Sequence, residues 1–191
     1  MKIVLATHNA HKVEELRGIL GERLGEHELL AYDGPEPVED GATFAENALI
    51  KARAAARHTG LPAIADDSGI AVDALGGAPG IHSARYAGTR DDGDNLRLLL
   101  ANLEGVADRG AAFVCAAALV DGEHEEVVTE RWAGRVLETP AGEGGFGYDP
   151  VFQPAGESRS AAELGREEKN AVSHRALAFG ALVERIRARL G

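Results

Sequence analysis

One stretch decides the fold class: Phe113-Val114-Cys115-Ala116-Ala117-Ala118-Leu119-Val120. Every residue in it is apolar, and an unbroken apolar run of this kind is typical of a strand buried on both faces of a sheet. Asp121-Gly122 marks a turn after it, and the residues from Val127 to Leu137 predict a long partner strand. The middle of the chain therefore predicts the centre of a well-covered sheet.

Strand and helix patterns continue on the N-terminal side of this run. Residues 2 to 6 predict a first strand, Thr7-His8-Asn9 supplies turn and cap chemistry, and a helix follows. Four apolar residues fall on one face of that helix, namely Val13, Leu16, Ile19 and Leu20. Glu28 to Tyr32 predict a second strand, which Asp33-Gly34-Pro35 closes.

The following segment predicts one helix and two short strands. Thr43-Phe44-Ala45-Glu46 is a capping-box pattern, and the alanine-rich helix that it opens runs to about His58. Ala63-Ile64-Ala65 predicts a strand that ends at Asp66-Asp67-Ser68-Gly69, and Ile70 to Asp73 predict a separate strand after it.

Two further helices complete the pattern. Leucines between Leu96 and Leu103 predict one helix, and Ser173 is the expected cap of another. The apolar face of the C-terminal helix comprises Phe179, Leu182, Val183, Ile186 and Leu190. Because helices and strands interleave while several strands follow one another directly, we expect an α/β fold with a mixed sheet, in a single domain over residues 1–191.

The composition limits the classes of binding partner that we expect for this chain. The 191 residues include 20 basic and 31 acidic side chains, for a formal net charge of −11, so we expect the chain to repel a nucleic-acid backbone unless its basic groups are strongly clustered. No apolar run approaches the roughly 18 residues of a membrane span, and the first residues lack a signal-peptide pattern. The single cysteine, Cys115, excludes a disulfide framework and is expected to be a buried small hydrophobe. We therefore expect a soluble, cytoplasmic protein with no nucleic-acid or membrane partner.

The pair Asp66-Asp67 is the first candidate for chemistry. Adjacent carboxylates at a strand end point in different directions, and one of them can bind a metal or accept a proton. Mg²⁺ prefers one or two carboxylates together with phosphate oxygens, and Glu39 and Asp40 are possible additional ligands. The alternative is an Asp-Ser-Gly turn in which Gly69 takes a positive φ, with Glu39 and Asp40 as solvated loop charges.

Two loops are candidates for ligand binding. Thr7-His8-Asn9-Ala10-His11-Lys12 lies between a strand and a helix, where backbone N–H groups and the helix dipole attract an anion. The alternative is an Asn9 helix cap followed by a solvated Lys12. Gly144-Gly145-Phe146-Gly147-Tyr148-Asp149-Pro150 places an aromatic ring among glycines, where a nucleobase could stack. The alternative there is an aromatic ring folded back on the core.

Lysine is rare in this chain and its positions are informative. Only four of the 20 basic residues are lysines, and three of them, Lys12, Lys51 and Lys169, fall in or beside these motifs. Lys51 shares an i,i+4 row with Thr43 and Asn47. This distribution predicts a local positive site inside a negative molecule. A further candidate is the segment Lys169-Asn170-Ala171-Val172-Ser173-His174-Arg175, whose alternative is a solvated helix start.

Together these motifs favour a nucleoside triphosphate as the common ligand. They also resemble those of the non-canonical purine nucleoside triphosphate pyrophosphatases, also called inosine triphosphatases or Ham1-like proteins. The resemblance covers nearly the whole chain and rests on Leu5 to Lys12, Thr43 to Ala48 with Lys51-Ala52, Ala65 to Gly69, Leu75 to Ile81 with Ser83 to Tyr86, Phe146 to Pro150, Glu168 to Asn170 and Ser173 to Arg175. One departure is His8, where bacterial relatives often carry glycine.

The resemblance implies an elongated mixed α/β fold with two lobes flanking a central cleft, usually as a homodimer. It implies hydrolysis of inosine, deoxyinosine and xanthosine triphosphates (ITP, dITP and XTP) to the monophosphate and pyrophosphate. In this chain it makes Asp67 the general base, Glu39 and Asp67 the Mg²⁺ ligands, and Ser68 a substrate contact. The phosphate-binding residues would be Thr7, His8, Asn9, Ala10, His11, Lys12, Lys51 and Lys169. The base-binding residues would be Phe146, Gly147, Tyr148, Asp149, His174 and Arg175.

Two other functions fit parts of the pattern. One is a related pyrophosphatase for modified pyrimidine or general deoxynucleoside triphosphates, which a substrate panel distinguishes. The other is a nucleotide sensor that binds without turnover, against which the carboxylate pair argues, because sensing needs no such pair.

Overall fold

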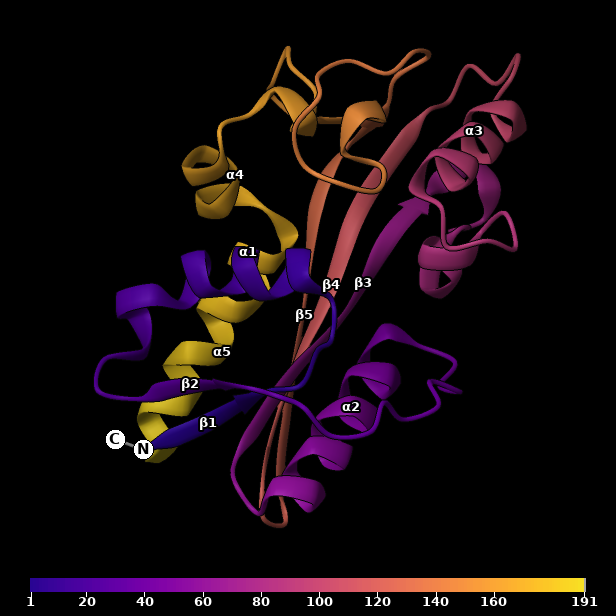
Figure 1. Cartoon of the computed structure of the whole chain (residues 1–191). Coiled ribbons are helices and arrows are strands. Elements are labelled where there is room, and N and C mark those ends of the chain that lie inside the picture. The colour runs from indigo at the N-terminus through magenta and orange to yellow at the C-terminus, as the bar shows by residue number, and fades with distance from the viewer. Residues whose placement is uncertain (191) are drawn as a thin grey trace. The chain divides into compact units, whose positions relative to one another are not determined.

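The computed structural model describes residues 1–190, in which helices alternate with the strands of one six-stranded sheet (Figure 1). The strands lie in the order β2-β1-β3-β4-β5-β6. Their bounds are Lys2–Leu5 (β1), Glu28–Ala31 (β2), Ala63–Val72 (β3), Gly110–Asp121 (β4), His124–Val136 (β5) and Phe152–Pro154 (β6). The α-helices are Ala10–Leu20 (α1), Phe44–Thr59 (α2), Asp92–Asn102 (α3), Arg166–Val172 (α4) and His174–Leu190 (α5).

The sheet is mixed, as the alternation of elements predicted. Strand β1 pairs in parallel with both β2 and β3, whereas β5 pairs antiparallel with β6. The chain divides into two compact units. Unit 1 comprises Met1–Asp67, Cys115–Glu130 and Ser173–Gly191, and unit 2 comprises Ser68–Val114 and Arg131–Val172. Two units agree with the two expected lobes, while the cleft and the elongated shape stay predictions.

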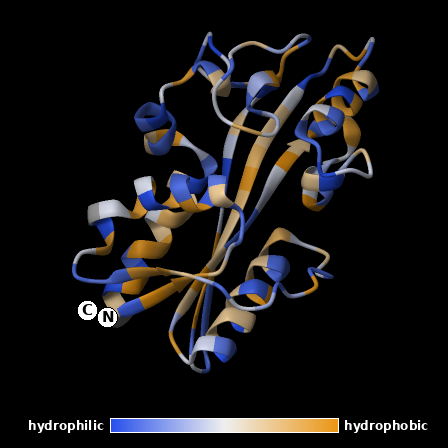
Figure 2. Ribbon diagram, in the orientation of Figure 1, coloured by the Kyte–Doolittle hydropathy of each residue, from blue (hydrophilic) through white to orange (hydrophobic). Residues whose placement is uncertain are grey.

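Unit 1 is built in three layers, with the sheet between α2 on one face and α1 and α5 on the other. This arrangement explains why the strand sequences are continuously apolar. Along β1, Ile3 and Leu5 belong to the cluster that includes α1 and α5, whereas Val4 belongs to the cluster that includes α2. Neighbouring residues on a strand point to opposite faces, so a sheet covered on both faces needs apolar residues at every position. The same alternation holds in β4, where Leu119 faces α5 and Val120 faces the α2 side. Figure 2 shows this hydrophobic character in β1 and along the central strands.

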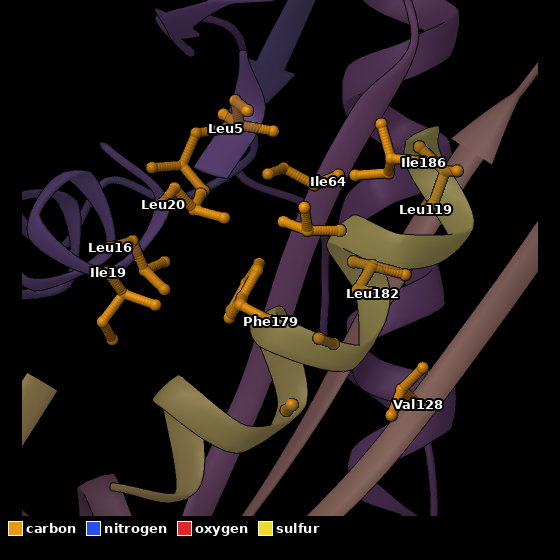
Figure 3. Close-up of a cluster of buried hydrophobic side chains, with 14 of the residues drawn as sticks. Leu5, Leu16, Ile19, Leu20, Ile64, Leu119, Val128, Phe179, Leu182 and Ile186 are labelled. Atoms are coloured by element: carbon orange, nitrogen blue, oxygen red, sulfur yellow. The ribbon is translucent and has the colours of Figure 1, made fainter. Parts of the chain in front are cut away.

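The larger core of unit 1 lies between the sheet and α1 and α5. Figure 3 shows Phe179, Leu182 and Ile186 of α5 directed toward the same cluster as Leu16 of α1 and Ile64 of β3. All five side chains are completely buried. This confirms the predicted apolar faces of both helices, except that the Leu190 side chain lies outside the described residues. Buried Cys115 belongs to this cluster, as its apolar neighbours predicted.

Unit 2 has its own core. Aromatic rings on neighbouring strands fill its centre: Phe113 lies edge-on to Phe152 with ring centroids 4.6 Å apart, and Trp132 lies 5.4 Å from Phe152. Leu99 of α3 is fully buried in the same cluster. The predicted leucine helix is therefore a core element.

The sequence prediction was wrong about β3. It placed a strand end at Asp66 and a second strand at Ile70, but a single strand runs from Ala63 to Val72. Gly69 does not have a positive φ, which excludes the alternative of an Asp-Ser-Gly turn. A Cβ on Gly69 would lie 2.3 Å from the Ser83 hydroxyl, so glycine is needed here for close packing within unit 2. Both aspartates therefore lie within a strand and not in a turn.

The other boundaries agree more closely with the patterns. Helix α2 begins with the predicted capping box, since Glu46 N donates to Thr43 Oγ1 and Thr43 N donates to Glu46 Oε2. It ends at Gly60, which takes the left-handed conformation. Sequence patterns did not predict α4 or β6. Within residues 1–190, no helix is both long and apolar enough to cross a membrane.

Candidate active site

Asp66 and Asp67 occupy opposite sides of β3, as neighbouring strand residues must. Asp66 is 1% exposed, and its Oδ2 accepts hydrogen bonds from Lys12 Nζ at 2.9 Å and from Arg175 Nε at 3.4 Å. Burial alone would raise the pKa of the Asp66 carboxyl, but the charges of Lys12, Arg175 and Lys51 outweigh it and hold that pKa well below its usual range. Asp66 is therefore ionised and sealed from solvent.

Asp67 has a different environment on the α2 side of β3. Its Oδ2 accepts a hydrogen bond from Asn47 Nδ2 at 3.1 Å, and its Oδ1 lies 3.5 Å from Lys51 Nζ. Burial raises the pKa of Asp67, and although Lys51 and Lys12 oppose this, Glu39 and Asp66 add to it. The side chain keeps 13% of its surface exposed. Asp67 thus combines access to solvent with a raised proton affinity, the properties of a general base.

Lys51 joins Asp67 to the loop before α2. Its ammonium donates to Glu39 Oε2 at 2.8 Å in addition to its contact with Asp67. Burial alone would lower the pKa of Lys51, but the negative charges of Asp67, Asp66 and Glu39 outweigh it and raise that pKa. Two carboxylates therefore share one cation, whereas Asp40 is exposed.

The donor set around Lys51 suits Mg²⁺ in its chemistry. Within the described residues, no three His, Cys, Asp or Glu side chains gather into a group that could hold a metal. Mg²⁺ commonly binds one or two protein carboxylates, while phosphate oxygens and water complete its coordination shell. Glu39 and Asp67 provide two such carboxylates. These two residues are the ones that could hold the ion.

Arg175 lies in a buried ionic network with a residue that sequence reasoning missed. Arg175 Nη1 donates to Glu15 Oε2 at 2.8 Å, although the two residues are 160 positions apart. Glu15 is 8% exposed and lies one turn after Lys12 on α1, on the face that also carries Leu16 and Ile19. The position of Glu15 on the apolar face of the helix was the sequence signal that could have predicted its burial. His174 is also buried, so the alternative of a solvated helix start is wrong for these two residues.

The loop before α1 is held by its own side chains. Asn9 Oδ1 accepts hydrogen bonds from the backbone N–H groups of His11 and Lys12, and Thr7 Oγ1 accepts one from Asn9 N. Asn9 is therefore the helix cap that the alternative interpretation described. Lys12 is not solvated, however, because its ammonium binds Asp66. The residues His8, Asn9, Ala10 and His11 are exposed.

Unit 2 carries the glycine-rich loop. Buried Asp149 organises it: Asp149 Oδ2 accepts hydrogen bonds from Phe146 N at 2.9 Å and from Lys169 Nζ at 2.7 Å. The same ammonium lies 5.2 Å from the centroid of the half-buried Phe146 ring. Tyr148 donates its hydroxyl hydrogen to the Ser83 carbonyl at 2.8 Å, and burial raises the pKa of that hydroxyl. Gly147 N donates to Asp92, which sequence reasoning also missed.

Comparison with known proteins identifies the family. A sequence model of the Ham1 family matches residues 3–185. The chain is 55% identical to the dITP/XTP pyrophosphatase of Leifsonia xyli, over 98% of this chain and 96% of that protein. It is also 55% identical to the Streptomyces coelicolor protein of the same name, over 100% and 99% of the two chains.

Solved structures agree. A HAM1 protein from Coxiella burnetii matches with a TM-score of 0.90 at 41% identity, over 98% of this chain and 99% of that one. The nucleoside-triphosphatase / dITP/XTP pyrophosphatase of Mycobacterium abscessus matches with a TM-score of 0.78 at 51% identity, over 95% and 98%. This chain belongs to the Ham1 family.

Within this Ham1 chain, the predicted site residues fall into two groups. Unit 1 brings together Lys12, Glu39, Lys51 and Asp67. Thr7 to Asn9 form the loop before α1, Ala10 and His11 begin that helix, and His174 and Arg175 begin α5. Unit 2 brings together Phe146, Gly147, Tyr148, Asp149 and Lys169, and Ser68 is its first residue, half-buried in β3.

The expectation of a local positive site needs correction. Lys12 and Lys51 do lie at the aspartate pair, but each is bonded to a carboxylate. Around the pair the cations are Lys12, Lys51 and Arg175, and the anions are Glu15, Glu39, Asp66 and Asp67. Lysines that are largely removed from solvent need counter-charges, and these two therefore belong to an ionic network in which carboxylates balance their charge.

Proposed function

We propose that this Ham1 protein hydrolyses deaminated purine nucleoside triphosphates, namely ITP, dITP and XTP, to the nucleoside monophosphate and pyrophosphate. Its similarity to proteins named dITP/XTP pyrophosphatase over nearly their whole length supports the substrate class. The observation that carries the chemistry is the environment of Asp67, a partly exposed carboxylate of raised pKa beside Glu39 and Lys51.

Asp67 acts as the general base in this proposal. Water attacks the α-phosphorus, and the bond between that phosphorus and the oxygen bridging to the β-phosphorus breaks, so pyrophosphate leaves. Asp67, in its ionised form, takes a proton from the water. It can reach the water because part of its side chain remains accessible. Asp66 does not compete for this role, because the charges of Lys12, Arg175 and Lys51 lower its pKa and burial removes it from solvent.

Positive groups would stabilise the charge that grows on the leaving pyrophosphate. We assign this role to Lys12, Lys51 and Lys169 together with the loop from Thr7 to His11. Lys51 is bonded to Glu39 and Asp67, and Lys12 to Asp66, so each ammonium is already oriented by a carboxylate. Glu39 and Asp67 would hold Mg²⁺. When bound, this ion neutralises phosphate charge and polarises the phosphoryl oxygens.

The base is assigned to the loop from Phe146 to Asp149, with Ser68, His174 and Arg175 as further substrate contacts. The purines of ITP and XTP carry a keto oxygen at position 6, where adenine carries an amino group. A site that offers hydrogen-bond donors to this oxygen leaves them unpaired against adenine, which disfavours ATP by several kcal/mol. We further propose that the protein is a cytoplasmic homodimer.

Product identity tests the function most directly. The protein is incubated with Mg²⁺ and each of ITP, dITP, XTP, GTP, ATP and a set of pyrimidine triphosphates, and both pyrophosphate and orthophosphate are measured. We expect pyrophosphate from ITP, dITP and XTP, with much slower release from the others. Orthophosphate alone would contradict cleavage at the α-phosphorus. A preference for pyrimidines would favour a related pyrophosphatase, and binding without any product would favour a sensor.

A further inference from the structure

We propose that Asn47 is a positioning residue of this site, whose amide orients the Asp67 carboxylate and ties it to the loop that carries Glu39. The inference rests on the proposed function, since it concerns the residue that we assign as the base. It assigns a role to a side chain that belongs neither to the phosphate-binding nor to the base-binding group.

The contacts of Asn47 define the direction of its amide. Asn47 is 4% exposed, its Oδ1 accepts a hydrogen bond from Gly41 N at 2.9 Å, and its Nδ2 donates to Asp67 Oδ2 at 3.1 Å. A backbone N–H can only donate, so the atom that faces Gly41 must be the amide oxygen. The amide nitrogen therefore faces Asp67, and the two contacts require each other.

Helix α2 holds both oxygens of the Asp67 carboxylate. Asn47 lies opposite Oδ2, and Lys51, one helical turn later, lies opposite Oδ1. Rotation about the last torsion of an aspartate is soft, so a carboxylate keeps one orientation only when its partners hold it. Lys51 alone is a weak constraint, since its contact with Oδ1 is 3.5 Å long. The Asn47 amide is the shorter and better-defined contact.

Gly41 connects Asn47 to the loop before α2, which carries Glu39 and Asp40. A Cβ on Gly41 would lie 2.6 Å from Asn47 Oδ1 and 2.8 Å from Glu46 Cβ, so only glycine allows the loop to approach this closely. Glu46 Oε2 also accepts a hydrogen bond from Ala42 N at 2.6 Å, which fixes the next residue of the loop. Glu39, two positions before Gly41, is thereby kept within reach of Lys51.

The consequence is that one neutral side chain aligns two carboxylates from separate segments. Removing its donor leaves the nucleotide-binding groups in place but lets Asp67 rotate, so the chemical step slows while binding does not. A displacement of about 1 Å at a reacting group costs about 100-fold in rate.

Asn47→Asp is the sharpest test, because an aspartate keeps the oxygen that accepts from Gly41 and replaces the donor that faces Asp67 with an oxygen, which also adds a buried negative charge. We expect kcat for ITP to fall about 100-fold. The dissociation constant of an ITP analogue with a non-hydrolysable α,β bridge, measured by calorimetry, should stay within about threefold of the wild-type value, as expected when only transition-state interactions are lost. Gly41→Ala displaces Asn47 without altering it, and should lower kcat about tenfold.

Asn95→Asp is the matched control. Asn95 is 1% exposed, and its Oδ1 also accepts from a backbone N–H, that of Ala87, but its Nδ2 donates to the Ala84 carbonyl and not to a carboxylate. This variant reports the cost of burying a new carboxylate, and its kcat should remain near the wild-type value. Melting temperatures are recorded for all variants.

Several results would overturn the inference. It fails if Asn47→Asp keeps kcat within about threefold of wild type, or if Asn47→Asp and Asn95→Asp lose kcat in proportion to their melting temperatures. If Asn47→Asp does not fold, Gly41→Ala decides, since an unchanged kcat there overturns the role and a lower kcat with unchanged analogue binding supports it. A wild type that releases no pyrophosphate would overturn the proposed function as well, whereas an active wild type isolates the role of Asn47.

Discussion

The two faces of β3 at Asp66 and Asp67 contain the same functional group in opposite circumstances. On the face toward α1 and α5, Asp66 is sealed between Lys12 and Arg175, and Arg175 is held in turn by Glu15. On the face toward α2, Asp67 has a neutral amide, a more distant ammonium and a remaining exposed surface. One carboxyl has a lowered pKa and the other a raised pKa.

The difference shows that the partners of a carboxylate determine its role. Two close cations stabilise the charge of Asp66. Its role is therefore structural, since these ion pairs join β3 to α1 and α5. Asp67 has fewer compensating charges and is a destabilised anion, which is the condition under which a carboxylate accepts a proton readily. Substituting each aspartate in turn tests this difference between the two faces of β3.

The largest effect is expected for Asp67→Asn. An amide cannot take a proton from water, so pyrophosphate release should fall by about 10³-fold or more. The melting temperature should be unchanged or higher, because the substitution removes a charge that burial disfavours. Pyrophosphate assays and thermal denaturation measure the two quantities. Activity close to that of the wild type would exclude Asp67 as the base.

Asp66→Asn should act in the opposite sense on stability. It leaves the half-buried Lys12 and the buried Arg175 without their shared carboxylate, so the free energy of unfolding should fall by about 3 kcal/mol. Urea denaturation measures the change, and the Asp67→Asn variant is the control at the adjacent residue. Equal stability of the two variants would contradict the difference between the two faces.

The stabilising effect of Asp66 should depend on pH with a definite sign. The folded-state pKa of Asp66 is below its unfolded value of about 3.9, so its contribution is fully present above that pH and is lost as the pH falls through the folded pKa. The stability difference between wild type and Asp66→Asn should therefore be constant from neutral pH to about pH 4 and narrow below it. Stability curves at a series of pH values test this, and a difference that shrinks already near pH 6 would be inconsistent with a lowered pKa.

The smallest effect is expected for an exposed ion pair in the same unit. Arg53 binds Glu125 through two hydrogen bonds of 2.6 and 2.5 Å, but both side chains are at least one third exposed. Glu125→Gln should lower the free energy of unfolding by less than about 1 kcal/mol, and added salt should reduce the effect. A loss as large as that of Asp66→Asn would show that burial is not what separates the two ion pairs.

Local sequence patterns predicted most of the regular elements, because each is determined by contacts between near neighbours. The capping box at Thr43 and the apolar face of α5 need only helical spacing. β3 was divided wrongly because polar residues are rare inside buried strands, and Asp66-Asp67-Ser68-Gly69 resembles a turn in any local window. Only the cations from α1, α2 and α5 make the aspartates acceptable there.

By itself, the sequence determined the family and the fold class and predicted which residues carry the chemistry, because these depend on residue types and their spacing along the chain. Only the tertiary structure decided which aspartate is sealed and which is accessible, since Glu15, Lys12 and Arg175 meet Asp66 from distant parts of the chain. It likewise decided that Asn47 faces Asp67, a contact between positions 20 residues apart. The physical reason is that a pKa or a carboxylate's orientation depends on distances in space, and charges separated by many residues become neighbours only when the chain has folded.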